Sequence, residues 1–255
     1  MPKTLISSRP SEEREAERDG SEVIYVAENF YDTIQGEGVT AGVPSAFLRT
    51  MGCTLRCGFC DTTPVWKYGN PYSVKEILSL WETSGLLDKL HQGQHLILTG
   101  GSPLKQQRGL TQLLKEIKKP ESEEVYVEVE NEAVLMPNPD FERYVNQWNN
   151  SPKLFNSLVP RLYRYKPEIL AYMNHLKDSW FKFVIRDAKE DWEEIESDFI
   201  NPGYVSRNRV VLMPEGGSRE RLMSRYQEVA KLCCEQGVRF TDRLQVTIFG
   251  EVTGV

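Results

Sequence analysis

The chain has few histidines and no excess of basic residues, and each shortage argues against a class of function. It contains three histidines in 255 residues, at no spacing typical of a zinc finger. Its formal net charge is −6 and its pI is ≈ 5.3. A surface that binds nucleic acid through its phosphates needs clustered Lys and Arg. We therefore expect no direct nucleic-acid partner.

Long apolar segments are also missing. No run reaches the roughly 18 apolar residues that a transmembrane helix requires, and the N-terminus lacks the apolar core of a secretory signal. The five cysteines are odd in number and unevenly spaced, which is typical of reduced thiols rather than of a disulfide framework. We expect a cytoplasmic protein without a membrane partner.

The first residues offer little that could be buried. Between Ser7 and Ser21 the chain is rich in Glu, Arg and Ser, and such a composition cannot offset the entropy of ordering. We predict a disordered N-terminal leader over residues 1–21 and a single catalytic domain over residues 22–255.

Beyond the leader, apolar runs with the period of a strand alternate with runs of helical period. Strands are predicted at Val23–Val26 with Phe30–Tyr31 as a first edge strand, then at Ser45–Thr50, Leu96–Thr99, Val125–Glu130, Lys153–Asn156, Trp180–Ile185 and Arg209–Met213. Helices are predicted near Val74–Trp81, Leu110–Ile117, Phe141–Trp148, Asp187–Phe199 and Ser218–Gln236, the last ended by Gly237. This alternation predicts an α/β fold with a mostly parallel sheet, and six or so units predict a partial (β/α) barrel open on one side.

Three cysteines lie together on one short segment that follows a predicted strand. Cys53, Cys57 and Cys60 have the spacing C-x3-C-x2-C, so their sulfurs can converge on three corners of a [4Fe–4S] cluster, which normally takes four thiolates. Cys233 and Cys234 are adjacent on a distant predicted helix and supply no fourth ligand. One iron would then be open to an exchangeable ligand. A zinc site is the alternative, although structural zinc prefers four protein ligands.

The cysteine segment, with Phe59 before its third cysteine, resembles that of the radical S-adenosylmethionine (SAM) superfamily. The resemblance implies that the open iron binds the amino and carboxylate groups of SAM. It also implies that an external flavodoxin or ferredoxin reduces the cluster, and that SAM is cleaved to a 5′-deoxyadenosyl radical that takes a hydrogen atom from the substrate.

Flanking motifs narrow the resemblance to the 7-carboxy-7-deazaguanine synthase family. They are the segments 33–38 (TIQGEG), 42–44 (GVP), 47–49 (FLR), 60–62 (CDT), 98–104 (LTGGSPL), 151–153 (SPK), 181–184 (FKFV) and 212–216 (LMPEG). The resemblance implies a radical ring contraction of 6-carboxy-5,6,7,8-tetrahydropterin to 7-carboxy-7-deazaguanine with loss of ammonia. It further implies a magnesium ion, a homodimer and a place in the synthesis of queuosine and related deazapurines.

The same resemblance assigns roles to individual residues. Cys53, Cys57 and Cys60 would hold the cluster, and Thr62 would bind Mg²⁺ together with the substrate carboxylate. The substrate would contact Ile34, Gln35, Gly36, Arg49, Thr99 and the terminal Val255. SAM would contact Phe59, Cys60, Asp61, Gly101, Ser102, Glu130, Ser151, Pro152, Lys153, Leu212, Met213, Pro214 and Glu215. Structural roles in turns and strand ends are the alternatives for Thr62, Glu130 and the segments 151–153 and 212–215.

One residue departs from the pattern of radical SAM proteins. Many of them carry a Glu after the paired glycines, where it accepts a hydrogen bond from the SAM amino group, whereas this chain has Ser102. Serine brings no charge, so we expect this contact to weaken unless another acidic residue substitutes. Glu130, at the end of the next predicted strand, is the candidate.

Two other functions share the cysteine segment. A protein that activates a glycyl-radical enzyme would admit a peptide rather than a pterin. A non-enzymatic iron–sulfur protein, used for electron transfer or sensing, would have no need of the Gly100-Gly101 turn or of the Gln35-Gly36-Glu37 segment.

Overall fold

One curved sheet organises the molecule. The computed structural model describes residues 2–8, 14–60 and 63–250. The strands are β1 Lys3–Ser7, β2 Val23–Ile34, β3 Pro44–Thr50, β4 Asn70–Ser73, β5 His95–Gly100, β6 Val127–Asn131, β7 Gln147–Asn150, β8 Ser179–Ile185, β9 Val210–Pro214 and β10 Arg239–Phe240. Their order is β1-β2-β3-β5-β6-β7-β8-β9-β10, with β4 paired to β2. From β3 to β10 every neighbouring pair is parallel.

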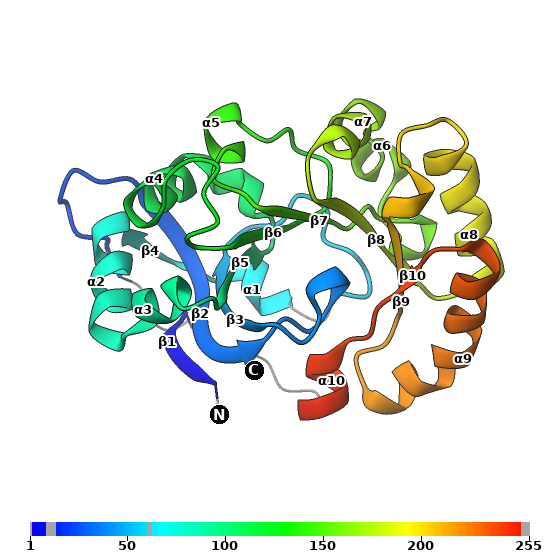
Figure 1. Ribbon diagram of the computed structural model, residues 1–255, viewed down its shortest axis with the longest axis horizontal. Helices are drawn as coiled ribbons and strands as arrows, with labels where there is room; N and C mark the ends of the chain where they lie inside the picture. The colour runs from blue at the N-terminus through cyan, green and yellow to red at the C-terminus, as the bar shows by residue number, and fades with distance from the viewer. Residues whose placement is uncertain (1, 9–13, 61–62, 251–255) are drawn as a thin grey trace.

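Most of the helices cover the outer side of the arc that the strands form, whereas the last one, Leu244–Phe249, lies on the inner side at the cavity (Figure 1). The α-helices of the described residues are α1 Thr63–Lys67, α2 Val74–Ser84, α3 Leu86–His91, α4 Gln107–Ile117, α5 Pro139–Glu142, α6 Arg161–Arg164, α7 Pro167–His175, α8 Ala188–Glu194, α9 Arg219–Gln236 and α10 Leu244–Phe249. Within the described part of the chain, the first and last strands in the order do not pair with each other. The prediction of a partial (β/α) barrel with a mostly parallel sheet is confirmed.

Local sequence explains where the main helices begin and end. Ser73 caps α2 by accepting from the Glu76 amide at 3.1 Å, and the Glu76 carboxylate accepts from the Ser73 amide at 2.6 Å, which is a capping box. Ser218 caps α9, and Gly237 ends it with φ of 66°. The predicted end of this helix at Gly237 is confirmed.

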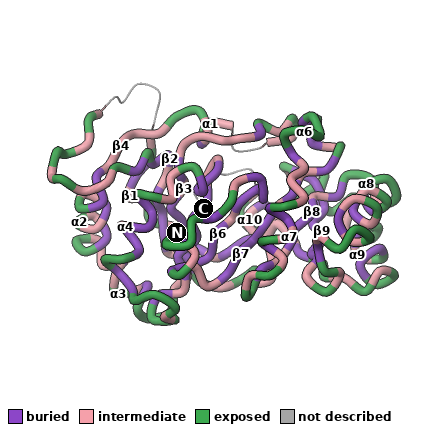
Figure 2. Tube along the Cα trace, turned by 90° about the horizontal axis from the view of Figure 1, so that it is seen from above, coloured by how far each residue is buried: buried purple, intermediate pink, exposed green. Residues whose placement is uncertain are grey.

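Most residues of the strands are buried, while the outer helices have both buried and exposed positions (Figure 2). Helix α4, for example, buries Leu110, Leu113, Leu114 and Ile117, the spacing expected of an amphipathic helix on a sheet. Among the described residues, no helix is long and apolar enough to span a bilayer.

The prediction that the N-terminal residues are disordered is wrong for the part of them that the structure describes, residues 2–8 and 14–21. Lys3–Ser7 is a strand that pairs antiparallel with β2 and buries Ile6, so β2 is not the edge strand that its sequence predicted. Arg14 forms an ion pair with Glu76 and its guanidinium lies 3.9 Å from the centroid of the Tyr72 ring. These charged residues are therefore ordered by polar and stacking contacts rather than by apolar burial.

Two further elements differ from prediction in the middle of the chain. The helix expected at Phe141–Trp148 is instead the short α5 followed by strand β7, and the strand expected at Lys153–Asn156 is absent. Trp148 and Phe141 both lie in the core, with ring centroids 6.1 Å apart. Apolar spacing in so short a segment cannot distinguish a helical turn from a strand.

Candidate functional site

A cavity of about 670 Å³ opens at the carboxyl ends of the parallel strands. Its walls come from the ends of β3, β5, β6, β7 and β9, from the cysteine segment, and from the segment that contains α10. Open α/β sheets and barrels bind ligands at this end of their strands, because the loops that follow the strands converge there. The arrangement places side chains that are distant in sequence around one space.

The cysteine segment forms one wall of this cavity. Cys53, Cys57 and Cys60 all line it. The backbone amides of Leu55 and Arg56 donate to Cys53 Sγ at 3.4 and 3.5 Å, and Arg56 adopts the left-handed conformation with φ of 57°. This local turn brings the first two cysteines to the same side of the segment.

The sulfurs are close enough to influence one another. Burial raises the pKa of the Cys57 thiol, Lys153 opposes this effect, and the charges of Cys53 and Cys60 raise it further. Among the described residues, no group of three or more His, Cys, Asp or Glu side chains is placed to hold a single metal ion. Three sulfurs on one wall without a fourth fit a cubane cluster, in which each sulfur binds a different iron.

The turn after β5 packs directly against the start of the cysteine segment. A Cβ atom added to Gly101 would lie 2.1 Å from the Gly52 carbonyl oxygen, so only glycine fits this close approach of two backbones. Ser102, the next residue, is fully buried and donates to Glu132 Oε1 at 2.7 Å. The turn is thereby connected to the loop after β6.

A polar cluster runs along β5 and β6 on the side of the loop after β2. Glu130 accepts hydrogen bonds from Gln35 Nε2 at 3.2 Å and from Thr99 Oγ1 at 2.9 Å. The fully buried Glu128 accepts from Asn149 Nδ2 at 2.7 Å and contacts His95 Nδ1 at 2.6 Å. Of these two carboxylates, only Glu130 lines the cavity, where it presents a hydrogen-bond acceptor to a ligand with N–H groups, whereas Glu128 is fully buried.

Arg49 supplies a cation to the same cavity. Its guanidinium lies 5.3 Å from the centroid of the Phe30 ring and 6.0 Å from that of Phe47, and its Nε lies 3.4 Å from Glu28 Oε2. Aromatic faces favour a planar guanidinium. The Arg49 side chain is therefore held in a fixed direction, with further donors available for an anionic group.

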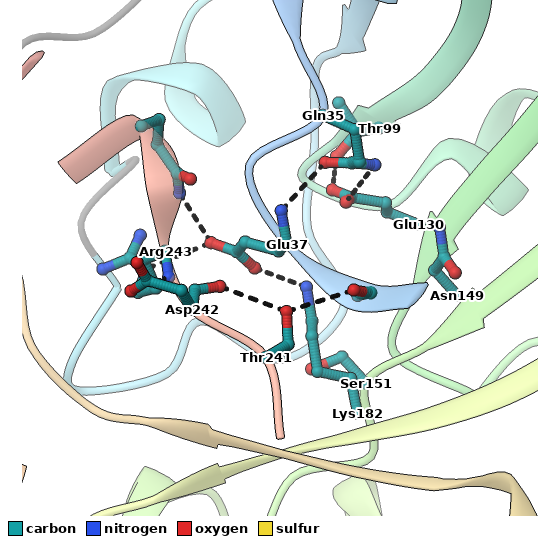
Figure 3. A network of polar contacts seen from close by, with 12 residues as sticks. Gln35, Glu37, Thr99, Glu130, Asn149, Ser151, Lys182, Thr241, Asp242 and Arg243 are labelled. Carbon is teal, nitrogen blue, oxygen red and sulfur yellow. Dashed lines mark hydrogen bonds and ion pairs between the residues drawn. The ribbon is translucent and has the colours of Figure 1, made fainter. Parts of the chain in front are cut away.

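A buried ion network joins the Gln35–Gly38 loop to the C-terminal segment (Figure 3). Glu37 forms ion pairs with Lys182 and, at 3.0 Å, with Arg243, and it accepts from Gln245 Nε2 at 2.7 Å. Burial alone would raise the pKa of Glu37, but the two cations hold it well below its usual range. The network fixes the loop that carries Gln35 and Gly36 into the cavity.

Comparison with known proteins shows to which family the chain belongs. Residues 34–131 match the model of the 4Fe-4S single cluster domain. The 7-carboxy-7-deazaguanine synthase of Pyrobaculum aerophilum is 32% identical over 227 residues, which cover 88% of this chain and 94% of that protein. The chain belongs to the 7-carboxy-7-deazaguanine synthase family. It is a radical SAM enzyme, and the family resemblance predicted from its motifs is confirmed.

Further relatives agree with this assignment. The 7-carboxy-7-deazaguanine synthase of Rhodopirellula baltica is 28% identical over 99% of this chain and 97% of its own length. The crystal structure of QueE from Escherichia coli superimposes with a TM-score of 0.65 at 20% identity, covering 88% of this chain and 96% of that one. The second comparison supports the fold.

Membership of the 7-carboxy-7-deazaguanine synthase family supports two of the predicted cofactors, the [4Fe–4S] cluster and SAM. The donor set agrees: three sulfurs line the cavity, while Cys233 is buried in the core and Cys234 is exposed on α9. In a family member the cysteine segment is thus the place where the cluster would be held.

Most of the residues predicted from the family motifs do surround the cavity. They are Ile34, Gln35, Gly36, Arg49, Cys53, Cys57, Phe59, Cys60, Thr99, Gly101, Glu130, Ser151, Lys153, Met213, Pro214 and Glu215. The predicted SAM contact Asp61, the predicted magnesium ligand Thr62 and the terminal Val255 lie outside the described residues.

Three predicted SAM contacts do not line the cavity. Leu212 points into the core from β9 and is 0% exposed, and Pro152 is buried beside the cavity-lining Ser151. Ser102 is also fully buried, with its hydroxyl directed to Glu132. In each case a neighbouring residue lines the cavity while the predicted contact itself is buried.

Several cavity residues were missed by the sequence analysis. Glu37, Lys182, Arg243 and Gln245 form the ion network, and Glu132 lies between the Gly100–Ser102 turn and the cysteine segment. A lysine within the apolar run Phe181–Val184 was the available signal, because a charge in a buried strand requires a partner. The identity of that partner depended on the fold.

Proposed function

We propose that this enzyme converts 6-carboxy-5,6,7,8-tetrahydropterin to 7-carboxy-7-deazaguanine with loss of ammonia. The observation that carries the proposal is one cavity lined both by the three cysteines and by Arg49, Gln35, Thr99 and Glu130. The name shared by its relatives supports the product. When bound, the cluster and SAM supply the one-electron chemistry that removes a hydrogen atom from the substrate.

The residues of the chain bind and orient the substrate. Arg49 pairs with the carboxylate, because a guanidinium favours two parallel hydrogen bonds with that group. The Glu130 carboxylate accepts from N–H groups of the bicyclic ring, while Gln35 and Thr99, which already donate to it, keep it in place. Holding the carboxylate and the ring at both ends fixes the reacting carbon relative to the cysteine segment, which is a large term in the rate.

The buried network around Glu37 gives this binding surface its rigidity. Leu244 N donates to Gly36 O at 2.9 Å, and a Cβ on Gly36 would overlap Gln245 Oε1. The loop that presents Gln35 is therefore packed against α10. A preorganised loop loses little conformational entropy when the substrate binds.

Three finer parts of the proposal rest on the family resemblance. Magnesium at Thr62, an external flavodoxin or ferredoxin as reductant, and a homodimer stay predictions. None of the residue roles above depends on them.

The test is turnover by the anaerobically reconstituted enzyme. With SAM, a low-potential reductant and 6-carboxy-5,6,7,8-tetrahydropterin, we expect ammonia and a deazapurine absorption to appear together. Arg49→Gln should raise the KM by roughly tenfold or more, since it removes a charge-assisted pair. Cys57→Ala should abolish turnover together with cluster iron, whereas Cys234→Ala should retain both.

A protein that binds SAM and leaves the pterin unchanged would contradict the proposed substrate. Glycyl-radical formation in a partner chain would instead support the activating-enzyme alternative.

A further inference from the structure

Glu132 is a buried carboxylate that the proposed reaction has not yet used. It follows β6, lines the cavity and is 7% exposed. Its Oε1 accepts hydrogen bonds from Ser102 Oγ at 2.7 Å and from Thr54 Oγ1. Within the described part of the chain, its Oε2 is buried and has no hydrogen-bond partner.

An unpartnered buried carboxylate oxygen is unfavourable, and proteins normally provide it with a donor or a cation. Lys153 is the cation whose charge interacts with Glu132. Its Nζ, however, donates to Ser151 O and Ser151 Oγ, both at 2.7 Å, and Glu132 Oε2 has no hydrogen-bond partner among the described residues. The donor for Oε2 is therefore to be sought in a ligand.

The contacts of Glu132 place it beside the cluster-binding segment. Thr54 directly follows Cys53, and Ser102 follows Gly101, which packs on the Gly52 carbonyl. Glu130, the residue predicted to compensate for the missing acidic group at position 102, is engaged instead by Gln35 and Thr99. The free acceptor near the cysteines belongs to Glu132.

We propose that Glu132 Oε2 accepts a hydrogen bond from the α-ammonium group of SAM. Ser102 and Thr54 act as positioning residues, because they hold the other carboxylate oxygen and thereby direct Oε2 into the cavity. The acidic function lost at position 102 is thus supplied from the loop after β6. This inference rests on the proposed function only for the use of SAM.

The test measures SAM affinity of the anaerobically reconstituted holoenzyme without pterin, by equilibrium binding. Glu132→Gln retains the shape and one acceptor for Ser102 and Thr54, which turns its amide NH2 toward the ammonium group. We expect SAM to bind roughly 10- to 100-fold more weakly. The desamino analogue of SAM, which keeps the sulfonium and the carboxylate, should bind the variant and the wild-type enzyme equally.

Ser102→Ala provides a second variant that keeps the Glu132 charge. It should weaken SAM binding by roughly two- to tenfold, again without affecting the desamino analogue. Glu130→Gln is the matched control, since it neutralises the neighbouring carboxylate, and it should change SAM affinity less than about twofold because Gln35 and Thr99 already occupy Glu130. Cluster iron content and thermal unfolding confirm that each variant is folded and loaded.

Two results would overturn the proposal: unchanged SAM affinity in Glu132→Gln, or an equal loss for SAM and for its desamino analogue, which indicates a general disturbance of the site. If the Glu132→Gln variant does not fold or load its cluster, Ser102→Ala decides the matter. An equal loss of affinity for SAM and for its desamino analogue in that variant would also overturn the proposal. The binding test contains no pterin, so its result does not depend on the proposed substrate. If the wild-type enzyme binds SAM here but does not convert the pterin in the turnover test, only the proposed substrate is contradicted.

Discussion

Lys182 on β8 forms a buried ion pair with Glu37, in the loop after β2, although 145 residues separate them in the sequence. The Lys182 and Glu37 side chains are 8% and 15% exposed. Arg243 and Gln245 complete the surroundings of the same carboxylate. The network joins β8 and the loop after β2 to the C-terminal segment, and its four side chains line the cavity.

Breaking this pair should destabilise the protein strongly. Lys182→Met leaves the Glu37 charge buried with one cation fewer, and we expect the free energy of unfolding to fall by about 3 kcal/mol. Lys231→Met is the matched control, because Lys231 pairs with Glu235 on the exposed face of α9, where such pairs contribute below about 1 kcal/mol. Urea unfolding measures both. Equal losses in the two variants would show that the buried network is not a special source of stability.

The same network predicts how stability depends on pH. The pKa of Glu37 is lowered in the folded protein from an ordinary value of 4.5. Between the folded and the unfolded pKa the unfolded chain binds more protons, so stability is present above the unfolded value and is lost as the pH falls. In Glu37→Gln we expect a shallower loss of unfolding free energy between about pH 5 and pH 3. Parallel slopes in urea unfolding would exclude Glu37 as a contributor.

The cluster-binding segment could be predicted from the sequence because its information is local. Cys53, Cys57 and Cys60 lie within eight residues, and a strand followed by such a segment places it at the ligand-binding edge of a parallel sheet. The alternation of helices and strands predicted the fold class for the same reason. Each of these signals lies within one turn or one strand.

The strand β6 shows what the sequence could not decide. Val127 and Val129 alternate with Glu128 and Glu130, a pattern typical of a strand with one solvent-exposed face. In the structure Glu128 is 0% exposed and hydrogen-bonded by Thr40 and Asn149. The glutamate face points into the concave side of the sheet, and this depends on the curvature of the whole sheet, which the residues of β6 alone do not determine.

Long-range partners were beyond prediction for a related reason. The contact between Ser102 and Glu132 depends on the pairing of β5 with β6 and on the conformation of the loop after each strand. Ala133 there has φ of 57°, a conformation that non-glycine residues rarely adopt. The family motif directed attention to Glu130, whereas this loop brings Glu132 to the cysteine segment.

Leu158 offers a test of backbone strain close to the cluster-binding segment. It has φ of 62° and is 72% exposed, and the preceding Ser157 carbonyl accepts from the Gly58 amide at 2.9 Å. A left-handed conformation is unfavourable for leucine by about 1–2 kcal/mol, and glycine recovers part of this. The larger conformational entropy of glycine in the unfolded chain offsets part of this gain, so we expect Leu158→Gly to raise the free energy of unfolding by about 0.5 kcal/mol.

Leu162 is the matched control for this substitution. It is 73% exposed but lies in helix α6 with ordinary helical neighbours. Leu162→Gly should therefore lower the free energy of unfolding by about 0.5–1 kcal/mol. Opposite signs in the two variants, measured by urea unfolding, identify the backbone conformation as the cause. A loss in both variants would contradict strain at Leu158.

Gly101 connects the turn after β5 to the cysteine segment, and enlarging it should displace that segment. In Gly101→Ala the new Cβ would lie 2.1 Å from Gly52 O and 2.9 Å from Cys53 N, so one backbone must move. Overpacking of this kind destabilises by about 1–3 kcal/mol, and here the shift acts on a cluster ligand. We expect cluster iron after anaerobic reconstitution to fall well below the wild-type content. Gly217→Ala is the control, because its Cβ would meet nothing within 4 Å; it should load normally. Full loading of Gly101→Ala would mean that the two backbones separate without moving Cys53, and the close approach would then serve the fold rather than the cluster.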